Sequence, residues 1–284
     1  MEDFPIPVEG AYAVSAPAPG SGPGHWAGAP SASIAHDGSL LVAYRVRTPD
    51  RRGSSLVLAH SDDRGRLTAV AALEKERFGA ESLERPALVR LEGGWRLYVS
   101  CATPNSKHWR IDVVEASDPA GLARAEPRTI FPGSNLVGVK DPVVRRAGDA
   151  WEAWICCHPL GEPGEEDRMT TAYATSRDGL EWDWQGTALS GRAGSWDARG
   201  ARVTAVLDDG RAAYDGRAGR EENFSERTGI ALPKGRRGRL VQAGDAPVSN
   251  ARYLDVVARP GGGWFLFFEM PRPDGSHDLC FESK

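Results

Sequence analysis

Carboxylate and imidazole side chains stand beside strand-like segments of this chain, at places where they can take part in proton transfer. Asp141 is followed by Pro142 at the start of an apolar run that ends at His158, and Asp197 stands in the segment WDARGAR. A carboxylate accepts a proton at neutral pH, and histidine can accept or donate one. We predict Asp141, Asp197 and His158 as catalytic candidates.

The elements that must position these residues are short strands arranged in a repeat. Five segments consist of a turn followed by an apolar, aromatic strand, and they begin at Asp37, Gly93, Gly148, Asp209 and Gly261. Each has a further strand-like segment before it and after it, which gives a period of about 55 residues. The chain also contains 33 Gly and 20 Pro, which suit many turns. We predict an all-β fold, a five-bladed β-propeller with antiparallel blades around a central funnel.

The register of the repeat predicts which residues face that funnel. Ala29-Pro30, Arg85-Pro86 and Asp141-Pro142 recur at a step of 56 residues, each ten residues before the second strand of its unit. Proline suits the first position of a strand, where no ladder donor is needed. The same count reaches Ala201 and Leu254 in the last two units. Side chains near these five strand beginnings should converge on one cavity.

Polar and aromatic residues near those beginnings are the candidates for ligand binding. Arginine can hold oxygen-rich ligands, and tryptophan can present a ring to a sugar face. The predicted substrate-binding residues are His25, Trp26, Glu84, Arg85, Arg199, Arg252, Glu269 and His277. We predict a small molecule or carbohydrate as the ligand, and neither a metal nor a cofactor.

At this point the sequence resembles the five-bladed propellers of glycoside hydrolase families 43, 32, 117 and 130, over roughly Trp26 to Phe281. The resemblance rests on the number and length of the units, on the x-Pro dipeptides, and on the turn motif from Ser176 to Trp182. It implies acid-base cleavage of a glycosidic bond inside the funnel. In the family 43 pattern a base, a pKa-tuning aspartate and an acid stand at the first, third and fourth entrances.

Carried over residue by residue, that pattern is matched in part. Asp141 matches the third position, whereas Ala29 stands where the base is expected. The fourth entrance offers Asp197, Arg199 and Arg202, with no glutamate. The resemblance to family 117, in which a histidine can be the acid, implies that role for His158 or His277.

Each candidate also has a structural alternative. Asp141 can be a hydrogen-bond acceptor within its blade, Asp197 can cap a turn, and His158 can be a satisfied core residue. Arg85 can pair with Glu84 alone. Glu269 and His277 can join the last blade to the first.

Charge and hydropathy exclude several classes of protein. The formal net charge of −4 disfavours a nucleic-acid partner, and no segment has the run of about 18 apolar residues that a membrane span needs. The four cysteines lie in apolar runs and should be reduced thiols, which together with the acidic N-terminus predicts a cytoplasmic protein. The sequence leaves the oligomeric state open.

The first 24 residues read as a Pro/Gly-rich arm, and residues 25–284 as a single propeller domain. The segment YAVSA within the arm is a candidate outer strand for the fifth blade, which would close the ring. Three functions fit these observations: a glycoside hydrolase-like enzyme on a glycoside or sugar-decorated small molecule, a non-catalytic carbohydrate- or metabolite-binding propeller, and a tailoring enzyme on a non-sugar metabolite.

Overall fold

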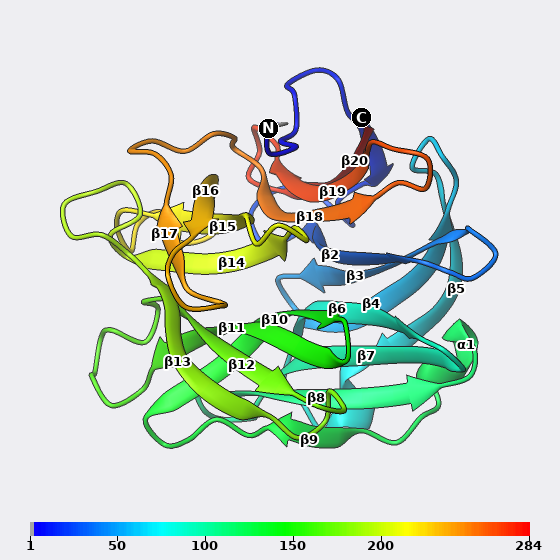
Figure 1. Ribbon diagram of the computed structural model, residues 1–284, viewed down its shortest axis with the longest axis horizontal. Coiled ribbons are helices and arrows are strands. Elements are labelled where there is room, and N and C mark those ends of the chain that lie inside the picture. Colours follow the sequence, from blue (N-terminus) through cyan, green and yellow to red (C-terminus); the bar gives the residue numbers. More distant parts are fainter. Residues whose placement is uncertain (1–2) are drawn as a thin grey trace.

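The computed structural model describes residues 3–284, and almost all of its regular structure is β (Figure 1). A 3-10 helix, η1 (Lys75–Phe78), and a short helix, α1 (Pro119–Leu122), interrupt the strands. No helix of the described part is long and apolar enough to cross a membrane. The strands of the first three blades are β2 (Trp26–Ile34), β3 (Leu40–Thr48), β4 (Arg52–Ser61) and β5 (Leu67–Glu74); β6 (Leu83–Leu91), β7 (Gly94–Ala102), β8 (Trp109–Ala116) and β9 (Arg128–Phe131); and β10 (Val137–Ala147), β11 (Ala150–Pro159), β12 (Thr170–Ser176) and β13 (Asp183–Ser190).

The last two blades complete the ring. They contain β14 (Gly200–Val206), β15 (Ala212–Arg217), β16 (Arg227–Pro233) and β17 (Leu240–Gln242), then β18 (Arg252–Ala258), β19 (Trp264–Pro271), β20 (His277–Ser283) and β1 (Ala13–Ala16). Within each blade, neighbouring strands pair antiparallel in this order. One parallel backbone pair, Trp26 with His277, links the strands of the fifth and first blades. The predicted antiparallel propeller is therefore confirmed.

The inner strand of every blade has a β-bulge. The register shifts at Ala29-Pro30 in β2, at Arg85 in β6, at Asp141-Pro142 in β10, at Thr204 in β14 and at Tyr253-Leu254 in β18. Ala29, Asp141 and Tyr253 have left-handed φ angles of 51°, 50° and 51°. Such a conformation costs a non-glycine residue roughly 1 kcal/mol or more, and it re-aims the side chain. The prolines identified in the sequence thus mark bulges, not strand starts.

The N-terminal arm closes the ring, as the YAVSA pattern suggested. Ala13 and Val14 of β1 pair with Phe281 and Cys280 of β20, so the fifth blade gains its fourth strand from the other end of the chain. Before β1, the Phe4 side chain is 8% exposed and packs into the core of the fifth blade. The backbone amide of Val8 also donates to a carboxylate oxygen of Glu282 at 2.8 Å.

Deleting residues 1–18 should therefore lower the free energy of unfolding by at least about 3 kcal/mol, because a buried phenylalanine and a whole edge strand are lost. Urea denaturation followed by tryptophan fluorescence measures this change. A shorter deletion of residues 1–3, which keeps Phe4 and β1, is the control. Equal stability of the two shortened proteins would contradict a closing role for the arm.

Candidate active site

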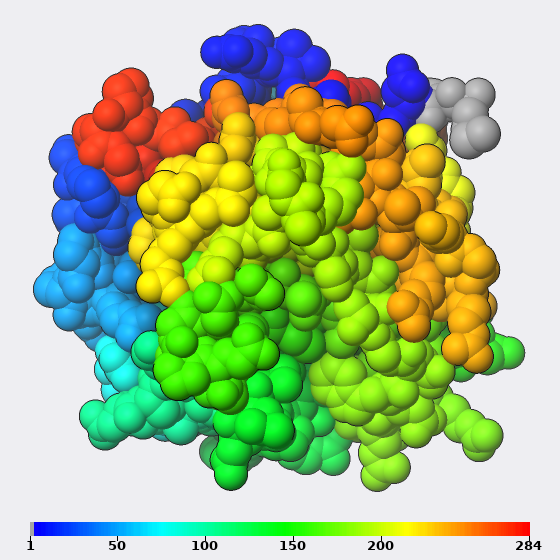
Figure 2. Space-filling view, turned by 90° about the vertical axis from the view of Figure 1, so that its left-hand side faces the viewer, coloured from blue at the N-terminus to red at the C-terminus, as the bar shows by residue number. Residues whose placement is uncertain are grey.

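A pocket of about 490 Å³ lies over the inner strands and receives side chains from all five blades. The segment between β15 and β16 and the segment between β11 and β12 both border it, and Figure 2 shows them in yellow and green, one above the other. The charged side chains of its floor, which are buried or nearly so, are Arg45, Glu84, Lys140, Arg202, Arg217, Glu226 and Arg252. These groups come from distant parts of the sequence and lie at one cavity, as the repeat predicted.

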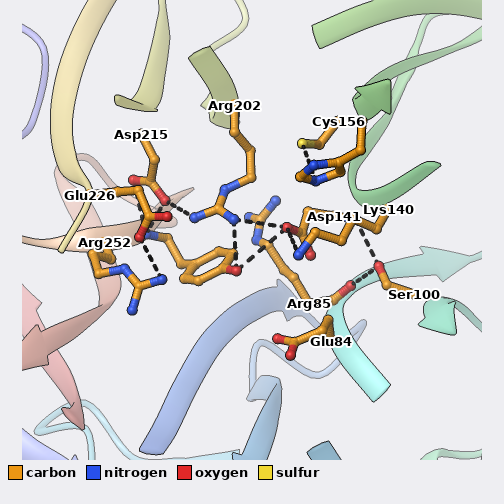
Figure 3. A network of polar contacts seen from close by, with 12 residues as sticks. Glu84, Arg85, Ser100, Lys140, Asp141, Cys156, Arg202, Asp215, Glu226 and Arg252 are labelled. Carbon is orange, nitrogen blue, oxygen red and sulfur yellow. Dashed lines mark hydrogen bonds and ion pairs between the residues drawn. The ribbon is translucent and has the colours of Figure 1, made fainter. Parts of the chain in front are cut away.

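Asp141 lies at the centre of this floor but beneath its lining (Figure 3). The side chain is fully buried; its Oδ2 accepts a hydrogen bond from Arg202 at 3.0 Å and lies 3.5 Å from the Lys140 Nζ. Its Oδ1 has no hydrogen-bond partner among residues 3–284. Burial alone would raise the pKa of this carboxyl, but Lys140 and Arg202 outweigh burial and lower it. Asp141 is therefore an ionised residue that fixes the lining cations.

Tyr253 occupies the position in β18 that Asp141 occupies in β10, and it lines the pocket. Its hydroxyl accepts a hydrogen bond from Arg202 at 2.8 Å and points toward Asp141, 3.5 Å away. The Arg202 guanidinium also lies over the phenol ring, 3.8 Å from its centroid. Burial raises the pKa of Tyr253 well above its usual value, so the phenol stays protonated.

Glu226 is the pocket carboxylate contributed by the fourth blade. It lies just before β16 and is 3% exposed, between Arg217 and Arg252, whose nitrogens are each 2.7 Å from one of its oxygens. Although burial opposes ionisation, Arg252, Arg202 and Arg217 lower the pKa of Glu226 to about 2. The group is therefore a base and not an acid at neutral pH.

Glu84 is a second ionised carboxylate of the lining, at the second entrance. It pairs closely with Arg45 and lies 3.5 Å from a nitrogen of Arg47. Burial would raise its pKa, but Arg45 and Lys140 lower it. As predicted, Glu84 faces the pocket.

Trp26 also borders the pocket, but other side chains cover its ring. It is 3% exposed; the Phe224 ring lies 4.8 Å away and the His277 ring 5.2 Å away. The ring that Trp26 was expected to present is instead offered by Phe224, which is 44% exposed at the rim and has a left-handed φ of 75°. The half-buried Trp109 also lines the pocket, with the Lys140 Nζ 4.8 Å from its ring centroid.

His158 lines the pocket, yet its environment contradicts a role as an acid. Its Nδ1 lies 3.0 Å from the carbonyl oxygen of Glu166, and its Nε2 lies 3.5 Å from the Cys156 Sγ. Burial, with repulsion from Lys140, lowers the pKa of His158 to about 3. The imidazole is neutral at pH 7, so it has no imidazolium proton to give.

A buried neutral histidine should make stability depend on pH. Because its pKa is lower in the folded protein, His158 contributes stability that is complete above about pH 6.5 and is lost as the pH falls toward 3. We expect the melting temperature of His158→Asn to vary less between pH 7 and about pH 4.5 than that of the wild type. Burial raises the pKa of Asp255 to about 6, so Asp255 favours the folded state more as the pH falls. This contribution is the same in both proteins and does not affect their comparison. The exposed His60→Asn is the control, and parallel curves for His158→Asn and the wild type would contradict the assignment.

Arg85 was predicted to bind substrate, but it plugs the axis below the pocket. Its guanidinium donates hydrogen bonds to the carbonyl oxygens of Pro30 at 3.2 Å, Pro142 at 3.2 Å and Thr204 at 2.6 Å, and it pairs with Asp255 at 3.4 Å. These partners belong to the first, third, fourth and fifth blades, so one side chain of the second blade joins all five. Buried and fully engaged, it is absent from the pocket lining.

Two other candidates also lie away from the pocket lining. Asp197 is buried in the turn before β14, where it accepts a hydrogen bond from the Tyr214 hydroxyl at 2.8 Å and pairs with Arg192 at 3.2 Å. His25 contacts the carbonyl oxygen of Gly22 at 3.4 Å, and it does not line the pocket. The structural alternative for Asp197 is therefore the correct one, because its carboxylate is satisfied within its own blade.

Of the remaining candidates, Glu269, His277 and Arg199 lie behind the lining, and Arg252 is part of it. Glu269 is fully buried and contacts Arg45 at 2.7 Å, Arg252 at 2.8 Å and His277 at 2.6 Å. Because Arg45 belongs to the first blade, Glu269 joins the last blade to the first, which was its alternative role. Arg199 holds Asp167, a lining residue, at 2.7 Å. Arg252 faces the pocket as predicted.

Comparisons with known proteins agree on the fold. No protein-family model and no curated protein sequence matches the chain. Among solved structures, it is similar to a β-1,2-mannobiose phosphorylase from Listeria innocua, with 12% identity, coverage of 98% of this chain and 92% of the other, and a TM-score of 0.64. A thermostable family-43 glycoside hydrolase shows 11% identity, 95% coverage of both chains and a TM-score of 0.69. An α-L-arabinofuranosidase from Lactobacillus brevis shows 11% identity, 90% coverage of both and a TM-score of 0.67. This chain has the propeller fold of glycoside-processing enzymes.

Proposed function

We propose that the protein is a glycoside hydrolase-like enzyme that cleaves a glycosidic bond in the pocket over the propeller axis. The observation that carries the proposal is the meeting of two ionised carboxylates, Glu84 and Glu226, from different blades at the floor of one cavity. The exposed ring of Phe224 and the half-buried ring of Trp109 provide apolar faces for a sugar. The fold shared with glycosidases and a phosphorylase supports this use of the pocket.

The chemistry assigned to these groups follows from their charge. Glu226 accepts a proton from a water molecule, whose oxygen then attacks the anomeric carbon while the bond to the leaving oxygen breaks. Glu84 stabilises the positive charge that develops on the sugar ring. The pKa values of Glu84 and Glu226 are both lowered, so neither group is a proton donor at neutral pH and the enzyme should favour leaving groups that depart without a proton.

Turnover tests this proposal directly. The protein is incubated with a panel of 4-nitrophenyl glycosides, because nitrophenolate leaves as an anion, and with the matching methyl glycosides. Parallel reactions contain inorganic phosphate, so that hydrolysis and phosphorolysis give distinct sugar products in mass spectrometry. Release of nitrophenolate with slower cleavage of the methyl glycoside is the expected result, and no product from any member of the panel would contradict the proposal.

A non-catalytic binding propeller is the second candidate, and Ala29 favours it. In the family resemblance this position holds the base, and a methyl group cannot activate water. Calorimetric binding of a sugar from the panel without any product, unchanged by Glu226→Gln except in affinity, would select this alternative.

A further inference from the structure

Three arginines from different blades surround Tyr253 at the pocket floor. The guanidinium carbons of Arg45, Arg202 and Arg252 lie 5.8, 3.8 and 5.3 Å from the centroid of its ring. They come from β3, β14 and β18, and each is at most 2% exposed. We call these three residues the arginine trio; Figure 3 shows Arg202 and Arg252 with their carboxylate partners.

The charges at the floor are arranged in two layers. The floor contains five cations, Arg45, Lys140, Arg202, Arg217 and Arg252, and two carboxylates, Glu84 and Glu226; the rest of the lining adds Arg52, Lys107, Arg220, Glu166 and Asp167. Three further carboxylates, Asp141, Asp215 and Glu269, contact the trio but are not part of the lining. Positive charge therefore faces the pocket, and the negative charge that balances it lies behind.

Three hydrogen-bond donors of the trio have no acceptor in the described chain, and the neighbouring Asp141 Oδ1 has no donor. In the described chain, Arg45, Arg202 and Arg252 each have an Nε–H without an acceptor, although all three atoms are buried. The close packing of three cations with unpartnered donors destabilises the folded protein, and an anion bound in the pocket would offset part of that cost. A guanidinium presents its donors in a planar fork that fits a carboxylate.

We propose that the ligand of this pocket carries a single negative charge on a carboxylate, as in a uronic acid glycoside, and that this group binds to the arginine trio beside the Tyr253 hydroxyl. The inference rests on the proposed function for the sugar part of the ligand. A single charge fits better than a dianion, because Glu84 and Glu226 share the lining and repel additional negative charge. The carboxylate thereby fixes which end of the sugar faces Glu226.

Binding by the wild-type protein tests the proposal without any substitution. Isothermal titration calorimetry compares glucuronate and galacturonate with glucose and galactose, and inorganic phosphate is titrated separately. We expect at least one uronate to bind at least about tenfold more tightly than its neutral counterpart, with weaker binding as NaCl rises from about 0.05 M to about 0.5 M. Equal affinity for uronates and neutral sugars would overturn the proposal, as would tighter binding of phosphate than of either uronate.

Conservative variants locate the site. Arg202→Lys and Arg252→Lys keep the charge but lose the planar fork, and Tyr253→Phe removes only the hydroxyl. Each should weaken uronate binding about 5- to 50-fold and weaken binding of the neutral sugar by a smaller factor, so that the preference for the uronate falls. The exposed Arg90→Lys is the control. Unchanged uronate binding in all three variants would place the anion elsewhere and overturn the proposal.

The two proposals fail in different ways. Cleavage of neutral glycosides without any uronate preference would leave the enzymatic proposal intact and remove the anionic ligand. A uronate preference without turnover would support the anionic ligand and contradict the enzymatic proposal.

Discussion

Replacing Glu226 by glutamine is expected to lower turnover by about 10²- to 10⁴-fold, which is the usual contribution of a general base. The amide keeps the size of the side chain but cannot accept the proton of the attacking water. Because the group is already ionised, with a pKa of about 2, the wild-type activity should persist on the acid side down to about pH 4. Initial rates with the best 4-nitrophenyl glycoside measure both effects.

A matched variant separates the loss of the base from disturbance of the loop. Glu221→Gln changes an exposed glutamate of the same segment and should retain the activity of the wild type. Circular dichroism shows whether Glu226→Gln keeps its fold, since Arg217 and Arg252 lose part of their pairing. Turnover of folded Glu226→Gln within about threefold of the wild type would remove Glu226 from the mechanism.

Replacing Arg85 by methionine is expected to destabilise the protein by about 3–5 kcal/mol. The substitution leaves three buried carbonyl oxygens without their donor and leaves the Asp255 carboxylate without its cation. Urea denaturation measures the loss, and Arg90→Met, on the exposed part of the same strand, should change stability by less than about 0.5 kcal/mol. If Arg85→Met loses less than about 1 kcal/mol, the axial plug is not a main support of the ring.

The fold could be predicted because its signals are periodic. Turn residues followed by aromatic strands recur in each unit, and a propeller is the arrangement that repeats such strands around an axis. The step between Ala29, Arg85 and Asp141 correctly predicted three equivalent positions, but these are bulges within the inner strands and not the strand starts that were expected. It failed in the fourth blade, where the bulge falls at Thr204 and not at the counted Ala201, because the distance between bulge and turn differs there.

The site was predicted less completely, because spacing in the sequence predicts the position of a residue's backbone but not the direction of its side chain. Arg85 stands at an entrance as expected, yet its long side chain runs along the axis to other blades. Arg45 lies in the run LLVAYRVR, and an arginine flanked by apolar residues in such a strand is the signal that was missed. Tyr253 is one residue from the counted Leu254. Glu226 lies in a loop that is not part of the sequence repeat, so its place in the pocket could be known only from the three-dimensional structure.

The measurement that tests the central claim most directly is a crystal structure of Glu226→Gln in complex with the tightest-binding sugar of the panel. The account predicts that the sugar lies in the pocket over the axis, with its anomeric carbon beside residue 226 and one ring face against Phe224 or Trp109. A sugar bound instead in the separate hollow lined by Tyr12, Val248 and Asn250, without contact to residue 226, would contradict it.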